Sequence, residues 1–180
     1  YLELARREHL QITHVAETHI HADFLCGSRE LAQLTGAELL LSDEGGPEWQ
    51  YGFEHTGLKH LSTFRVGQLE FKVLHTPGHT PESTCYLLDG KVLFTGDTLF
   101  LAGVGRPDLE ATADGARLRA EHLHASLRKI LSLPPETLIL PGHVSHPVPF
   151  DGVPLYARLA EVRERVQSLQ LPVSDFVTWV

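Results

Sequence analysis

The sequence has no methionine, only two cysteines, and no apolar run that approaches the roughly 18 residues of a membrane-spanning helix. Because the chain starts at Tyr1 and contains no methionine, we expect it to be amino-terminally truncated. Cys26 and Cys85 lie far apart and form no C-x-x-C motif, which argues against a disulfide framework and against a thiolate zinc site. We expect both to be small buried residues of a protein in a reducing compartment, the cytoplasm.

Basic charge is also scarce, with 15 Lys and Arg against 23 Asp and Glu and a formal net charge of -8. Proteins that bind nucleic acid or anionic membranes usually carry a basic patch, so we expect neither partner. The 180 residues, 42% hydrophobic and 21% charged, suffice for one domain with a sizeable core. We therefore predict a single domain over residues 1–180 that acts on a small molecule.

Hydrophobic periodicity and turn residues predict an α/β chain in which helices and strands alternate. We expect helices near residues 2–5, over 28–34 before Gly36, from Asp114 as the cap to about 131, and over 156–169 and 174–180. We expect strands over 11–16, 37–41 and 137–140, and hairpins over 63–75 and 84–95, the second turning at Asp89-Gly90. Residues 42–60 are expected to form a long polar loop.

Groups that can bind a metal follow four of these predicted strands. His19 and His21 lie in T-H-I-H-A-D, His79 in T-P-G-H-T, Asp97 in T-G-D-T and His143 in P-G-H. Loops that follow strands are common places for binding sites, because a rigid scaffold holds them. A lone histidine is more often a surface or hydrogen-bonded residue, and Asp97 alone could be a turn residue. Together and in this order, the motifs predict a metal site.

Two further groups of residues follow from this interpretation. Thr80 and Ser83 flank the turn after His79 and are expected to fix it through hydrogen bonds. The other histidines are interpreted as surface or core residues without a role in the site: His9, His14, His55, His60, His122, His124 and His146.

The four motifs in this order resemble the metallo-β-lactamase superfamily over most of the chain. Within it, the stretch G-D-T-L-F-L-A-G-V-G-R-P-D-L most resembles the persulfide dioxygenases and their rhodanese-fused bacterial relatives, with glyoxalase II as a hydrolytic cousin. The resemblance implies an αββα sandwich. Because domains of this family open with strands that precede the residues present here, it also implies that the amino-terminal strands are missing.

The resemblance also bears on the number of metal ions. Enzymes similar to glyoxalase II carry T-H-x-H-x-D-H, whose last two residues help to bind a second metal, whereas this chain has Phe24 in place of that histidine. Phenylalanine cannot bind a metal, so only Asp23 and His143 remain of the second site, with Asp97 as a bridge. One metal per chain is therefore expected.

In the persulfide dioxygenases, two histidines and one carboxylate hold Fe(II), and the matching positions here are His19, His79 and Asp97. Such a triad leaves coordination positions open for reactants. His21 would be a near neighbour or weak ligand, and zinc is the alternative metal. Arg106 matches the position that grips a glutathione carboxylate, a task that suits its forked guanidinium. The alternative for Arg106 is a structural ion pair with Asp108 or a neighbour.

Three hypotheses follow for the function. The first is a mononuclear non-haem iron dioxygenase that oxidises glutathione persulfide or a related persulfide to sulfite. The second is a metal-dependent hydrolase of glutathione thioesters, and the third is a non-catalytic or partner-dependent metal-binding module. A fused or separate rhodanese and a second copy of the chain, in a homodimer, are the protein partners that the resemblance leaves open.

Overall fold

The computed structural model describes residues 1–180 except 22–24, 110–111, 145–146 and 150. In chain order, the elements are α1 (Leu2–Arg7), β1 (His14–Ala16), α2 (Ser28–Thr35), β2 (Glu38–Ser42), β3 (Thr56–Leu58), β4 (Thr63–Val66), β5 (Leu69–His75), β6 (Thr84–Leu88), β7 (Val92–Gly96), α3 (Ala113–Leu131), β8 (Leu138–Pro141), β9 (Ala157–Arg158), α4 (Leu159–Arg165), the 3₁₀ helix η1 (Gln167–Gln170) and α5 (Val173–Trp179).

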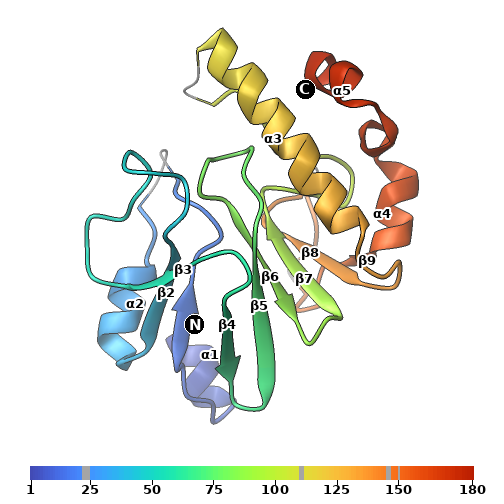
Figure 1. The fold of residues 1–180 in the computed structure, drawn as a ribbon. Helices are drawn as coiled ribbons and strands as arrows, with labels where there is room; N and C mark the ends of the chain where they lie inside the picture. Colours follow the sequence, from blue (N-terminus) through green and yellow to red (C-terminus); the bar gives the residue numbers. More distant parts are fainter. Residues whose placement is uncertain (22–24, 110–111, 145–146, 150) are drawn as a thin grey trace.

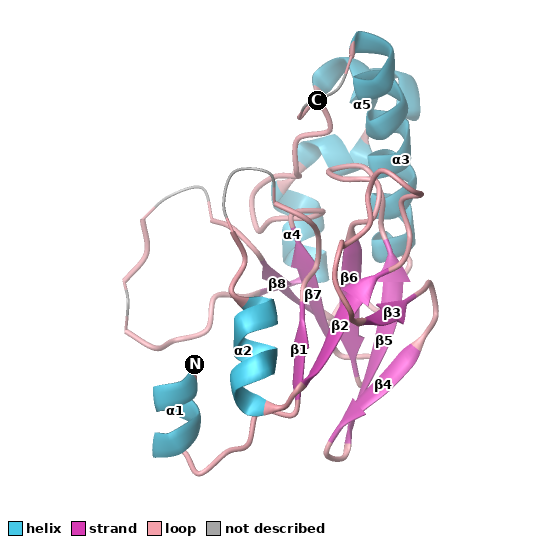
Figure 2. Cartoon of the chain, turned by 90° about the vertical axis from the view of Figure 1, so that its left-hand side faces the viewer, coloured by secondary structure: helices cyan, strands magenta, loops and turns pink. Residues whose placement is uncertain are grey.

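The strands form two sheets that pack against each other. The first is parallel, in the order β1-β2-β3, and the second has the order β4-β5-β6-β7-β8-β9. In the second sheet β4 to β7 are antiparallel neighbours, and β8 pairs parallel to β7 after the chain has crossed over through α3. Helices α1 and α2 lie on one side of the two sheets and α3, α4 and α5 on the other (Figures 1 and 2). The αββα sandwich expected from the resemblance is therefore confirmed.

Alternation of side chains along the strands separates the hydrophobic core into layers. On β2, Leu39 and Leu41 pack with Ala32 of α2, whereas Leu40 packs with Val73 and other residues of the second sheet. On the far face of the second sheet, a third cluster joins strand residues to α3, α4 and α5 and includes Cys85, Leu87, Leu93, Leu123, Leu127, Ile139, Val162 and Phe176. Each pair of adjacent layers thus has its own buried cluster.

Several turns form where the sequence places them. Asp89 and Gly90 both have positive φ, 47° and 66°, as the two-residue hairpin between β6 and β7 requires. Gly36 ends α2 in the left-handed conformation, with φ of 69°. The predicted hairpins and the strand before His143 are confirmed within a residue or two at each end.

Other expectations are corrected. The polar segment 42–60 contains β3, and the single helix expected over 156–169 is instead the strand β9, the helix α4 and the helix η1. Thr112, not Asp114, caps α3, because the Thr112 hydroxyl accepts a hydrogen bond from the backbone N–H of Gly115 at 3.2 Å. Cys85 is buried as expected, but Cys26 is exposed. No helix within the described part of the chain is long and apolar enough to span a membrane.

Candidate metal centre

The metal-capable residues converge because their strands point the same way. In an antiparallel sheet alternate strands run in the same direction, so β5 and β7 end at the same edge, and β8, parallel to β7, ends there too. His79, Asp97 and His143 follow these three strands. The first sheet joins at the same edge, where the Thr84 N–H donates to the carbonyl of Thr18, next to His19, at 2.8 Å.

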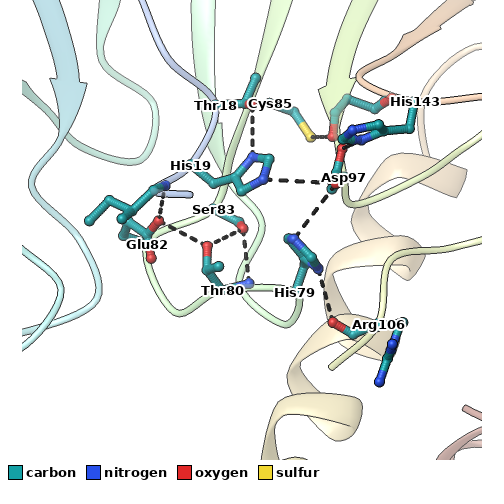
Figure 3. A network of polar contacts seen from close by, with 12 residues as sticks. Thr18, His19, His79, Thr80, Glu82, Ser83, Cys85, Asp97, Arg106 and His143 are labelled. Atoms are coloured by element: carbon teal, nitrogen blue, oxygen red, sulfur yellow. Dashed lines mark hydrogen bonds and ion pairs between the residues drawn. The ribbon is translucent and has the colours of Figure 1, made fainter. Parts of the chain in front are cut away.

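Three side chains form a compact buried cluster. One ligand atom each from His19, His79 and Asp97 lies within 4.8 Å of the other two. The Asp97 Oδ2 atom is 3.9 Å from His19 Nε2 and 3.7 Å from His79 Nε2 (Figure 3). Among the described residues, these three are the one group of His, Cys, Asp and Glu that meets this condition. The expected triad is therefore brought together.

The outer ring nitrogens fix how the two imidazoles point. His79 Nδ1 donates to the backbone carbonyl of Arg106 at 2.9 Å, which leaves the lone pair on Nε2 facing Asp97. His19 Nδ1 is 2.9 Å from the Thr18 hydroxyl. Burial lowers the pKa of His19 to about 4 and also lowers the pKa of His79, so both rings are neutral at neutral pH. Neutral imidazole is the form that binds a metal.

The cluster fits a bound metal ion on two grounds. The buried His19 Nε2 has no hydrogen-bond partner among the described residues, although a buried polar atom normally finds one. Two imidazoles and one carboxylate form a donor set that accepts Fe(II) or zinc. An ion between the three ligand atoms would satisfy His19 Nε2 and balance the Asp97 charge.

The residues expected at a second metal position have different surroundings. His143 is close, and its Nδ1–H donates to Asp97 Oδ1 at 2.7 Å, although 60% of its side chain is exposed. The His21 ring lies beside that of His19, with 4.2 Å between ring centroids, but His21 is outside the three-residue cluster. Asp23 and Phe24 lie outside the described residues. His143 therefore holds one carboxylate oxygen of Asp97 and leaves Oδ2 for the cluster.

Glycines let the backbone come close to Asp97. A Cβ on Gly105 would lie 1.8 Å from the Asp97 carbonyl oxygen and 3.2 Å from the His79 Cβ. A Cβ on Gly142 would lie 2.6 Å from Asp97 Oδ1. The ladder between β7 and β8 also shifts register between Phe94 and Gly96, an irregularity typical of strand ends that aim a side chain into a site.

Arg106 contributes to the centre through its backbone. Its guanidinium forms two hydrogen bonds to Asp108, at 2.9 and 3.0 Å, and both side chains are exposed. The Arg106 side chain thus forms the ion pair with Asp108 that was expected as the alternative to a role in binding substrate. Its carbonyl orients His79, a role that no side-chain pattern in the sequence could reveal.

The turn after His79 contains the expected hydrogen bonds and also a buried acidic residue that was not predicted from the sequence. The hydroxyls of Thr80 and Ser83 are 2.7 Å apart, and the Thr80 N–H donates to Ser83 Oγ at 3.2 Å, as expected for residues that fix this turn. The missed residue is Glu82, which is completely buried in the same turn. A charged residue between a metal motif and a buried strand was the signal that could have identified it.

The comparison with known families agrees with this geometry. A model of the metallo-beta-lactamase superfamily matches residues 2–143. The chain belongs to the metallo-β-lactamase superfamily. This superfamily member is 36% identical over 133 residues to a hydroxyacylglutathione hydrolase of Rhodospirillum rubrum, a match that covers 73% of this chain and 48% of that protein. The chain spans about half the length of the curated relatives it matches.

Two solved structures share most of the fold of this metallo-β-lactamase superfamily chain. A metallo-beta-lactamase from Staphylococcus aureus subsp. aureus COL has a TM-score of 0.89 at 33% identity, and the match covers 99% of this chain and 55% of that one. ETHE1 from Myxococcus xanthus has a TM-score of 0.80 at 34% identity, covering 98% of this chain and 72% of that one. Both matches therefore extend over nearly the whole of this chain.

Proposed function

We propose that this chain carries the metal centre of an enzyme that acts on a glutathione-type sulfur compound, and that persulfide oxidation is the reaction its site geometry supports best. The supporting observation is the buried cluster of His19, His79 and Asp97, a set of two histidines and one carboxylate. This donor set is typical of mononuclear non-haem Fe(II) oxygenases. The resemblance of residues 96–109 to persulfide dioxygenases supports the same reaction.

Each residue has a defined part in this proposal. His19 and His79 would hold the ion through Nε2, and Asp97 through Oδ2, while the Arg106 carbonyl and Thr18 hydroxyl keep the rings oriented. Fe(II) bound there would supply open positions that bring the two reactants together, whereas zinc would polarise a thioester carbonyl and acidify water. The Arg106 guanidinium would release Asp108 and bind a carboxylate of the thiol carrier in its place.

Hydrolysis of a glutathione thioester is the second candidate, and the names of the relatives favour it. The match from Rhodospirillum rubrum is named a hydroxyacylglutathione hydrolase, and so is another from Rhizobium etli. His143, on Asp97 at the edge of the cluster, would then help to bind a second ion. The third candidate is a module that binds metal without turnover until it meets a partner such as a rhodanese.

One set of assays separates the candidates. The protein is purified without added metal, its metal content is measured by elemental analysis, and samples loaded with Fe(II) or with zinc are assayed. Oxygen uptake with glutathione persulfide by the iron form supports the dioxygenase. Thiol release from a hydroxyacylglutathione without oxygen uptake supports the hydrolase instead, and metal binding with neither activity supports the module.

Two histidine variants test whether either activity depends on the metal centre. His79→Ala removes a cluster ligand, and His55→Ala removes a histidine that instead contacts Asp43. We expect His79→Ala to abolish turnover and His55→Ala to keep it. Turnover that survives in His79→Ala would refute the proposed centre.

A further inference from the structure

Glu82 is a fully buried carboxylic acid that has no place in the proposed chemistry. It lies in the turn between β5 and β6, three residues after His79, and none of its surface is exposed. Burial raises the pKa of its carboxyl group. Burying a carboxyl group lowers the stability of the fold unless hydrogen bonds replace those to water. A buried glutamate is therefore unexpected in a turn that only connects two strands.

Its hydrogen bonds join the two segments that carry the histidine ligands. Glu82 Oε1 accepts from the backbone N–H of Ile20 at 2.6 Å, and Ile20 stands directly after His19. The same oxygen accepts from the Thr80 hydroxyl at 2.9 Å, and Thr80 stands directly after His79. One carboxylate oxygen therefore connects the neighbours of both ligands across the two sheets (Figure 3).

The surroundings hold this carboxylate in place. A Cβ on Gly45 would lie 2.8 Å from the Glu82 Cβ and 3.0 Å from the Glu82 backbone nitrogen, so the segment after β2 packs closely over the turn. The other carboxylate oxygen, Oε2, is buried and has no hydrogen-bond partner among the described residues. Within the described part of the chain, Oε1 alone accepts hydrogen bonds at this carboxyl group, and it accepts them from the ligand segments.

We propose that Glu82 is a positioning residue of the metal centre, which sets the separation of His19 and His79 by holding Ile20 and Thr80 through a single oxygen. The distance between the His19 and His79 rings, 4.9 Å between centroids, depends on this connection because the two histidines come from different sheets. The inference rests on the metal centre of the proposed function and is independent of the reaction catalysed there.

The test compares three variants of Glu82 with a control in the core. Glu82→Gln keeps an oxygen that can accept from Ile20 and Thr80, Glu82→Asp shortens the reach of the acceptor, and Glu82→Ala removes it. Val162→Ala, in the fully buried core of α4, destabilises the fold away from the centre. The measurements are the Zn²⁺ affinity by competition with a coloured chelator, the visible absorption of the Co²⁺-loaded protein, and the Tm of the metal-free protein.

We expect Zn²⁺ affinity to fall about 10- to 100-fold in Glu82→Ala and Glu82→Asp, as measured for residues that orient metal ligands, and to stay within about threefold of wild type in Glu82→Gln. The Co²⁺ absorption bands should change in the first two variants. Val162→Ala should lower the Tm and leave both metal readouts unchanged.

Two results would overturn the inference. One is Zn²⁺ affinity and Co²⁺ spectra in Glu82→Asp that match wild type, because this variant keeps the charge and changes only the reach. The other is Glu82→Gln that binds Zn²⁺ as weakly as Glu82→Ala. Wild-type protein that binds no Zn²⁺ at all would refute the metal centre itself, a failure that is distinct from either of these.

Discussion

At the scale of single residues, His19 and His79 share one arrangement, in which Nδ1 contacts a supporting oxygen and Nε2 lies toward Asp97. The sequence motifs identified His19, His79 and Asp97 because their residue types and their order along the chain carry the information. The supports could not be predicted in the same way. The Arg106 carbonyl belongs to the backbone, and the contact between Glu82 and Ile20 spans 62 positions of the chain.

The low pKa of His19 predicts how the stability of the metal-free protein depends on pH. The folded pKa is about 4 and the ordinary value is 6.5, so the unfolded chain takes up this proton first as the pH falls. The free energy of unfolding should therefore decrease between about pH 6.5 and about pH 4, by at most about 1.4 kcal/mol per pH unit from this group. Urea unfolding of wild type and His19→Asn checks this, and curves of equal slope against pH would contradict it.

The pair of Arg106 and Asp108 gives a second prediction at this scale. If Arg106 binds a substrate carboxylate, Arg106→Ala should raise KM about 10-fold or more and change kcat little, because a charge-assisted contact to bound substrate is lost. Asp108→Ala frees the guanidinium and should lower KM or leave it unchanged. Steady-state kinetics of both variants decides the matter. An equal rise of KM in the two would mean that the pair only shapes the loop.

At the scale of elements, hydrophobic periodicity in the sequence predicted the longer strands and helices. The β4–β5 and β6–β7 hairpins and α3 were predicted because they are long enough to show a repeat and are bounded by turn residues. Two elements were missed, β3 with three residues and β9 with two. Such short strands show no period of their own, and pairing with β2 and β8 defines them instead.

The loop between β7 and α3 gives a prediction with a control in the same segment. Gly105→Ala would place a methyl group against the Asp97 carbonyl and should weaken metal binding by at least about tenfold. Gly103→Ala is the matched control, because a Cβ at this position would meet nothing within 4 Å. This variant should bind metal with wild-type affinity. Zn²⁺ titration of the two variants measures the difference. Equal affinities would show that the close approach of Gly105 is not needed.

At the scale of the molecule, the four-layer sandwich places the centre where both sheets end. Family resemblance predicted the sandwich. Composition alone predicted only a domain with a core, because it carries no information on which sheet faces which. The separation of the buried residues into three clusters, one between each pair of layers, appears only in the folded structure.

A metal ion held by both sheets should stabilise the whole fold. At a free metal concentration about 100 times Kd, binding adds about 2.7 kcal/mol to the free energy of unfolding, equivalent to a Tm about 5–10 °C higher in a chain of this size. Treatment with a chelator should therefore lower the Tm, and added Zn²⁺ should restore it. Calorimetric scans of wild type and Asp97→Ala test this, with no metal-dependent change expected in the variant. A wild-type Tm that changes with neither the chelator nor added Zn²⁺ would contradict the proposed metal site.

The division of the ligands between the two sheets also has a consequence for the order of folding. His19 follows a strand of the first sheet, and His79 and Asp97 follow strands of the second. Neither sheet alone can assemble the triad, and contacts between residues so distant in sequence form slowly because of the chain entropy lost in closing the loop between them. Capture of a metal ion during refolding should consequently report the moment at which the sheets dock, after the hairpins of the second sheet have formed.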